Sequence, residues 1–245
     1  MKASAIEFRL RMAIMTTIIV LGFWAPWIER WHIGSRIPLL EWLALELARS
    51  GLLSFTVATP VVILFATLIA AKAAITRIWG TAYLGAGIVN HAQMQAGAVM
   101  AAGPYRYVRN PLYLGLWMMV VAMAFIMPLS GAIFAIVLST VFLFRLILGE
   151  EAFLAVKLGE PYLAYKKAVP RLIPRVRTNL PRAEFKPAWL LAVIAEIGPI
   201  GIFLIIAGLS WQYNNWLMVK AVIVSFGVSI VAKAFLPQTP GQAAI

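Results

Sequence analysis

The sequence predicts an all-α membrane protein: a polytopic helical bundle of about six transmembrane helices, with both termini in the cytoplasm. Composition is the first observation behind this prediction. Hydrophobic residues make up 62% of the chain and the mean hydropathy is +0.89, whereas soluble domains usually contain about 45–50% apolar residues. Charged residues are only 12% of the 245 residues, and they are grouped between long apolar stretches. The chain is therefore expected to be integral to a membrane.

Six apolar stretches are long enough to cross the roughly 30 Å of hydrocarbon in a bilayer. They cover residues 12–28, 52–71, 112–128, 131–148, 187–209 and 216–236. Only Leu129 and Ser130 separate the third stretch from the fourth, so these two are expected to form a tight helical hairpin. The first stretch is not followed by a convincing small-residue cleavage site, and we interpret it as a retained helix.

Residues 78–103 are uncharged and rich in Gly, Ala and Gln. They are either a seventh span or an interfacial, partly inserted helix on the cytoplasmic face. Asn90, His91 and Gln93 would be costly at membrane depth unless they lined a cavity. The interfacial helix, lining a polar site, is the favoured interpretation.

The distribution of charge orients the spans. Segment 72–111 contains four basic residues and no acidic residue, and segment 145–186 contains nine basic residues against four acidic ones. The connections 128–130 and 210–215 carry no charge. Because cytoplasmic loops carry an excess of Lys and Arg, the basic segments and both termini are placed in the cytoplasm.

The residue types present argue against several functions. The net charge of +12 is explained by cationic cytoplasmic loops near anionic headgroups, so no nucleic-acid partner is expected. The chain has no cysteine, which excludes disulfides, thiolate metal sites and cysteine nucleophiles. His32 and His91 are too few for a zinc site without unusual help, and no metal is expected.

Two polar motifs stand where apolar stretches meet water on the predicted cytoplasmic side. Residues 103–113 combine cations with aromatics, and Glu150 with Glu151 forms a carboxylate pair one apolar hairpin later. Asn110 and Pro111 suit the N-cap and the first position of a helix, whose positive dipole end favours an anion. Together the helix start and the carboxylate pair predict a site for a zwitterionic, cationic ligand.

These charged residues also have a simpler interpretation, which the sequence leaves open. In it, Arg106 and Arg109 only reach lipid phosphates. The glutamates are then a solvated helix end that pairs with Lys157 or Arg109. Arg145 precedes Glu150 by five residues, about 140° around a helix, so it is not expected to be their partner within that helix.

Residues 158–174 predict a helix stop at Gly159, a short amphipathic helix and an extended exit. Tyr162 and Tyr165 lie three residues apart, on one face of the short helix. They are expected to anchor this helix at the membrane interface, with capping of the polar site as the alternative.

A set of short motifs runs through about residues 77–175. In chain order they are Asn90-His91, Gly103-Pro104-Tyr105, Arg109-Asn110-Pro111-Leu112-Tyr113-Leu114-Gly115, Glu150-Glu151-x-x-Leu154 and Gly159-x-x-Tyr162-x-x-Tyr165. This set resembles the isoprenylcysteine carboxyl methyltransferase family and its phospholipid methyltransferase relatives. The chain then divides into residues 1–76 with the first two spans, a methyltransferase-like core at 77–175, and residues 176–245 with the last two spans.

The resemblance implies S-adenosylmethionine as methyl donor, bound at the cytosolic face. It also implies a lipophilic acceptor, such as a prenylated cysteine carboxylate or a related lipid, that enters from the bilayer. The histidine that usually precedes the motif proline in the family is Asn110 here. The residues that the resemblance and the motif place at the cofactor are His91, Val99, Met100, Tyr105, Asn110, Pro111, Leu112, Tyr113 and Glu150.

The nature of the acceptor decides which further residues are needed. A carboxylate acceptor would need a cation, for which Arg109 and Arg145 are candidates. An amine acceptor would need a proton acceptor, for which Glu151 or His91 is a candidate. In the family an arginine about one helical turn before the paired glutamates serves the substrate; Leu146 holds that place here, and Arg145 is one residue away.

Two other function classes remain open on sequence alone. One is an NADPH-dependent membrane reductase of the sterol-reductase type, but Gly115 stands where those enzymes tend to have a glutamate, and the glutamate pair is additional. The other is a non-enzymatic lipid-binding or transport protein. Glu196, deep in the fifth span, keeps that class open because ionisable residues at membrane depth are usually functional. Its alternative interpretation is a protonated glutamate bonded to a neighbouring helix.

Overall fold

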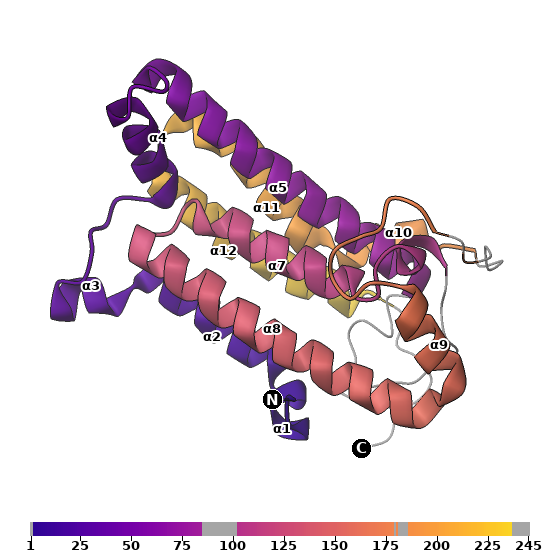
Figure 1. Cartoon of the computed structure of the whole chain (residues 1–245). Helices are drawn as coiled ribbons and strands as arrows, with labels where there is room; N and C mark the ends of the chain where they lie inside the picture. Colours follow the sequence, from indigo (N-terminus) through magenta and orange to yellow (C-terminus); the bar gives the residue numbers. More distant parts are fainter. Residues whose placement is uncertain (1, 85–101, 179, 181–185, 237–245) are drawn as a thin grey trace.

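The computed structural model describes residues 2–84, 102–178, 180 and 186–236. Within these residues the regular structure is helical and no β-strand occurs, which confirms the all-α fold class (Figure 1). The helices are α1 (Ala5–Arg9), α2 (Arg11–Trp24), α3 (Pro26–Trp31), α4 (Leu39–Arg49), α5 (Phe55–Leu84), the 3₁₀ turn η1 (Gly103–Arg106), α7 (Pro111–Ala124), α8 (Leu129–Leu158), α9 (Glu160–Ala168), α10 (Trp189–Ala195), α11 (Ile197–Leu209), the 3₁₀ turn η2 (Ser210–Gln212) and α12 (Asn215–Ala234).

Three of the described helices, α5, α8 and α12, are long and apolar enough to cross a membrane. The pair α10 and α11 raises this number to four if it counts as one broken span, with a bend of 66°. Helices α2 and α7 are apolar but have 14 residues each, about 21 Å at 1.5 Å per residue. All six predicted stretches thus form apolar helices, while the count of six spans and the orientation of the termini stay predictions.

The long helices lie alongside one another, and the short ones gather at the two ends. Figure 1 shows α5, α7 and α8 running side by side, with α9 and α10 at one end and α4 at the other. Helix α5 contacts α4, α7, α10 and α11, whereas α8 contacts α7 and α2, and α11 pairs with α12. Helix α5 therefore joins the α7–α8 hairpin to the C-terminal helices.

Helices α2 and α8 approach so closely that their contact requires glycine. A Cβ atom added at Gly131 would overlap the carbonyl oxygen of Gly22, and one added at Gly22 would meet Ala135 and Met127. Small residues at such crossings are typical of membrane helix pairs, because they let two backbones approach.

The turn of the α7–α8 hairpin lies earlier than predicted. Leu129 and Ser130 are the first residues of α8, and residues 125–128 form the turn instead. Pro128 lies in the N-cap position of α8 with an extended backbone, and Phe125 donates its backbone N–H to Ala122. The apolar composition of these turn residues hid the turn in the sequence pattern.

Helix α5 extends well beyond its predicted end at residue 71. Lys72 and Arg77, expected in a cytoplasmic loop, lie on the helix, and residues 78–84 continue it rather than beginning a separate interfacial helix. The rest of that predicted interfacial helix lies outside the described residues. The helix tolerates Arg77 because an acidic partner reaches it from another helix.

The predicted fifth span is broken at Glu196, which separates α10 from α11. Pro199 explains the break, because a proline lacks the N–H of a helical hydrogen bond and its ring clashes with the carbonyl four residues earlier. That carbonyl belongs to Ala195, the last residue of α10.

Candidate functional site

The predicted polar site lies at the end of the α7–α8 hairpin where α9 and the segment after it cross the start of α7. Two backbone bonds hold this segment to the loop before α7, from Arg109 N to the Pro170 carbonyl at 2.9 Å and from Arg175 N to the Tyr107 carbonyl at 3.0 Å. The loop and the helix pair that the sequence motifs occupy are therefore brought together.

Glu151 is the most heavily contacted carboxylate of this region, with 3% of its side chain exposed. Arg171 donates to both of its oxygens, with Nη2 2.8 Å from Oε2 and Nε 3.1 Å from Oε1. Arg109 adds an ion pair, with Nη1 3.4 Å from Oε1. Glu151 in turn raises the pKa of the Arg171 guanidinium by accepting these bonds. Its two cationic partners favour a structural role, and its predicted role as proton acceptor stays a prediction.

Asn110 occupies the N-cap position of α7 as predicted, and Pro111 takes the first helical position. The expected side-chain cap is absent, however. The Asn110 Nδ2 group donates instead to Glu151 Oε1 at 3.3 Å and to the Arg171 carbonyl at 3.2 Å. A hydrogen bond to a charged carboxylate is stronger than one between neutral groups, which favours the side-chain orientation that directs Nδ2 toward Glu151. Asn110 thereby ties the start of α7 to α8.

Glu150, the neighbour of Glu151, faces a different partner. The Tyr113 hydroxyl donates a hydrogen bond to its carboxylate, and Arg11 on α2 is a nearby cation. Adjacent residues point about 100° apart on a helix, which separates the two carboxylates. The structure thus brings together Glu150 and Tyr113, two residues predicted to bind the cofactor.

Arg109 is 8% exposed, yet its Nε and Nη1 atoms make no hydrogen bond among the described residues. The Nε of Arg106 is likewise buried without a bond there, although the Arg106 Nη2 group donates to the Leu180 carbonyl. Buried donors are nearly always bonded in folded proteins, so unused guanidinium donors mark a place where an acceptor group can bind.

Three buried tyrosines form the wall between η1 and α9. Tyr165 donates its hydroxyl to the Tyr105 carbonyl at 2.8 Å, and Tyr162 packs beside Tyr165 with tilted rings whose centroids are 6.0 Å apart. Burial raises the pKa of Tyr162 to about 12 and raises those of Tyr105 and Tyr165, so all three keep their protons at neutral pH. The prediction that Tyr162 and Tyr165 are interfacial anchors is wrong, because both are buried.

Arg145 lies apart from this cluster. It donates to both oxygens of Glu7 in α1, at 2.8 and 2.9 Å, and its carbonyl accepts the backbone N–H of Ala3. Leu146 is buried in the apolar core. Arg145 thus holds the N-terminal helix against α8, as expected of a residue without a partner among the glutamates of its own helix.

The other predicted cofactor residues are placed only in part. Leu112 points toward α5, where its side chain lies against Gly80, and its carbonyl accepts a bond from Arg77 at 3.3 Å. His91, Val99 and Met100 lie outside the described residues. The cofactor roles of all these residues stay predictions.

Arg171 is the residue of this region that sequence reasoning missed. It follows Pro170 in the segment predicted only as an extended exit, and its guanidinium lies over the Phe144 ring at 5.5 Å. The sequence did contain a signal for Arg171. A basic residue directly after Pro170, whose backbone is restricted, was available to pair with one of the two glutamates that had no assigned partner.

Glu196 forms a second buried charged cluster, outside the predicted site. Its side chain is 1% exposed and accepts two bonds from Arg77, with Nη2 2.8 Å from Oε1, and one from the Thr81 hydroxyl at 2.6 Å. It is bonded to a neighbouring helix, as one interpretation expected. The partner, however, is a guanidinium, so the cluster is an ion pair rather than a protonated glutamate.

Comparisons with known proteins agree with this placement of the motifs. Residues 53–160 match the model of the phospholipid methyltransferase family. A stretch of 70 residues is 41% identical to the methanethiol S-methyltransferase of Crocosphaera subtropica and covers 29% of this chain and 27% of that protein. No solved structure matches the chain.

The predicted resemblance to the membrane methyltransferases is therefore confirmed for residues 53–160. The matched region holds α5, η1, the α7–α8 hairpin and both glutamates. The aligned stretch spans only about a quarter of the curated relative's length, and Arg171 falls beyond the matched residues.

Proposed function

We propose that the protein is an integral membrane methyltransferase that uses S-adenosylmethionine and acts on a lipophilic acceptor. The observation that carries the proposal is the division of labour between the paired glutamates, within a segment that belongs to a methyltransferase family. Glu151 is held by two arginines, whereas Glu150 accepts a bond from the Tyr113 hydroxyl and lies near the charge of Arg11. Glu150 is therefore the carboxylate available to a cationic ligand.

The residues present fit S-adenosylmethionine, which combines a sulfonium and an ammonium with a carboxylate. The Glu150 carboxylate suits the cationic groups, while the unused donors of Arg109 and the positive end of α7 suit the carboxylate. The cofactor would supply a methyl group that is already activated on the sulfonium. The contribution of this chain is then to position the two reactants and to balance their charge.

Each residue of the cluster has a definite part in this proposal. Glu150 and Tyr113 hold the cofactor. Glu151 and Arg171 are positioning residues, because their bonds fix the start of α7 through Asn110. His91, Val99, Met100 and Tyr105 are proposed cofactor neighbours on the family pattern alone.

The acceptor is proposed to enter laterally from the bilayer, because the cluster lies at the end of apolar helices. An anionic acceptor, such as a prenylated cysteine carboxylate, would meet Arg109. Arg145 is less suited to this role than the sequence suggested, since Glu7 already neutralises it. The relative from Crocosphaera subtropica is named for methyl transfer to a thiol, so a small or lipid-linked thiol is a further acceptor to test.

The proposal predicts that Glu150→Gln weakens binding of S-adenosylmethionine about tenfold or more. A hydrogen bond to a charged group contributes about 1.5–3 kcal/mol, and about 1.4 kcal/mol is a factor of ten. Isothermal titration of the purified full chain in detergent measures the affinity. Glu160→Gln, at an exposed position on α9, is the matched control and should bind like the parent.

Transfer of a radiolabelled methyl group then tests the activity. A prenylcysteine analogue, an aminophospholipid and an alkyl thiol serve as acceptors, with NADPH binding measured alongside. Binding of S-adenosylmethionine with transfer to any of the three supports the proposal. A parent protein that binds NADPH instead, or binds neither, contradicts it.

A further inference from the structure

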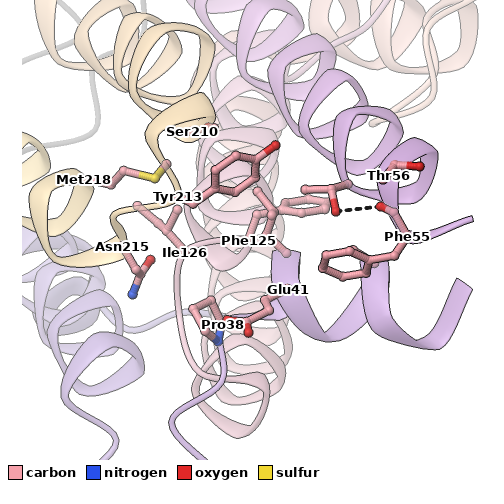
Figure 2. A pocket seen from close by; sticks show the side chains of 13 residues that line it. Pro38, Glu41, Phe55, Thr56, Phe125, Ile126, Ser210, Tyr213, Asn215 and Met218 are labelled. Atoms are coloured by element: carbon pink, nitrogen blue, oxygen red, sulfur yellow. Dashed lines mark hydrogen bonds between the residues drawn. The ribbon is translucent and has the colours of Figure 1, made fainter. Parts of the chain in front are cut away.

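A cavity of about 530 Å³ lies beside α4 (Figure 2). Helix α4 is at the opposite end of the bundle from α9 and the glutamate pair (Figure 1). The cavity is lined by α4, the start of α5, the α7–α8 turn, η2 and the start of α12. Helix α7, about 21 Å long, separates it from the polar cluster, so it is a second site and not part of the first. The residues that line it are Pro38, Leu40, Glu41, Ala44, Phe55, Thr56, Thr59, Phe125, Ile126, Ser210, Tyr213, Asn215 and Met218.

Backbone hydrogen bonds between α4 and the α7–α8 turn fix the position of one wall of this cavity. The backbone N–H groups of Leu39 and Leu40, at the start of α4, donate to the carbonyls of Met127 and Phe125, both at 2.9 Å. Helix α4 therefore lies against the hairpin turn, and it also packs on α5. Helix α4 lies between the first two predicted spans, where the sequence predicted only a connection.

The cavity combines a buried apolar floor with an aromatic rim. Phe125, Ile126 and Met218 are buried, whereas Phe55 and Tyr213 remain about half or more exposed. Figure 2 shows these aromatic residues around the cavity, with Glu41 beside Pro38 at one edge. The volume lies within the roughly 300–1,000 Å³ typical of small-molecule sites.

Two hydroxyls of the cavity already donate to backbone carbonyls. The Thr59 hydroxyl donates to the Phe55 carbonyl at 3.0 Å, and the Ser210 hydroxyl donates to the Ile206 carbonyl. Both hydroxyls have used their single proton, so they offer only lone pairs to a ligand. None of the lining residues is Lys, Arg or His, and Glu41 supplies a carboxylate.

Glu41 is not neutralised by an ion pair within the described part of the chain. By contrast, Glu46 on the same helix forms an ion pair with Arg49 at 3.0 Å. A carboxylate, hydroxyl lone pairs and the faces of aromatic rings are all complementary to a cation, and aromatic faces bind desolvated ammonium groups especially well.

We infer that this cavity binds a hydrophobic cation, a molecule with an apolar body and an ammonium or phosphonium centre. The apolar body would occupy the floor at Phe125 and Met218, and the cationic centre would lie between the aromatic rim and Glu41. The inference goes beyond the proposed methyl transfer, since no residue of the cavity belongs to the glutamate cluster.

Tetraphenylphosphonium and tetraphenylborate provide a matched test, because they have the same shape and opposite charge. Binding to the full chain in a neutral maltoside detergent is measured by equilibrium dialysis. We expect saturable binding of the phosphonium, and at least tenfold weaker binding of the borate. Equal affinity for the two ions would mean that the cavity is merely apolar, and would overturn the inference.

Two variants on α4 test whether the Glu41 carboxylate is the group that attracts the cation. Glu41→Gln should lower phosphonium affinity about tenfold and leave the borate unaffected, whereas Glu46→Gln should change neither. Both positions are on the protein surface, so both variants are expected to fold. Unchanged phosphonium affinity in Glu41→Gln would contradict the inference.

A labelling assay in a protein that keeps Glu41 tests the location of the bound phosphonium independently of the Glu41→Gln variant. The native chain has no cysteine, so Ser210→Cys introduces a single thiol in the wall of the cavity. The phosphonium should slow its alkylation by a maleimide, while the borate at the same concentration should not.

Discussion

Two buried glutamates, Glu151 and Glu196, are both paired with arginines, but the arginines differ in how many of their donors are bonded. Each is at most 3% exposed and accepts a two-pronged contact from an arginine of another element. Around Glu196, all three nitrogens of Arg77 donate, two to the carboxylate and one to the Leu112 carbonyl. Around Glu151, two nitrogens of Arg109 make no hydrogen bond in the described part of the protein.

We propose that this difference separates a structural cluster from one that can also bind a ligand. A fully bonded charged network fixes helices to one another and leaves nothing for a ligand. A network with unused donors beside a second carboxylate, Glu150, has capacity for a polar ligand. Burial and charge alone would have ranked the two glutamates together, so the unused hydrogen-bonding capacity is the informative quantity.

The largest expected effect comes from breaking the structural cluster. Arg77→Ala should lower the free energy of unfolding by about 3–5 kcal/mol, because it removes the arginine that is bonded to the buried Glu196 carboxylate. Thermal unfolding in detergent, followed by tryptophan fluorescence, measures the loss. The double variant Arg77→Met with Glu196→Leu should recover much of it, since an apolar pair replaces the charged one. Unfolding of Arg77→Ala at the parent temperature would show that this ion pair does not hold α5 to α10 and α11.

Arg109→Ala should instead reduce ligand affinity more than stability, and its effect should be smaller than that of Arg77→Ala. Glu151 keeps Arg171 as a partner, so stability should change by about 1 kcal/mol or less, whereas S-adenosylmethionine affinity should fall about tenfold with the loss of charged donors. Titration of the folded variant measures the affinity, and Arg109→Lys should restore only part of it because a lysine lacks the planar fork. Large destabilisation with parent-like affinity would make Arg109 a structural residue like Arg77.

The smallest effect is expected at the N-terminal contact between Glu7 and Arg145. Bonds from Arg145, and then from the Ser4 backbone, lower the pKa of Glu7 from 4.5 to about 2. A lowered carboxyl pKa means that the contact is fully present above pH 4.5 and is lost as the pH falls toward 2. A spin label on Ala3→Cys should become more mobile across that window. In Glu7→Gln the label should show no such transition; a transition that persists there belongs to another group.

Local sequence signals predicted the elements of the site but not its partnerships. Asn110 and Pro111 correctly placed the start of α7, and Gly159 correctly separated α8 from α9, because caps and breakers act on the nearest backbone. The predicted side-chain cap is absent because the Asn110 side chain is oriented to donate its Nδ2 to Glu151, which lies 41 residues away. The break at Glu196 could have been anticipated from Pro199, whose effect is also local.

The sequence by itself determined that this protein is a bundle of apolar helices, and it indicated the family from motifs on the ends of one hairpin. Those properties depend on run length, composition and short-range order along the chain. Only the tertiary structure decided what each charge does, because the partners are distant: 119 residues separate Arg77 from Glu196, and 138 separate Glu7 from Arg145. A buried charge is stable only beside its partner, so the packing of the helices determines which arginines are fully bonded within the fold and which keep unused donors.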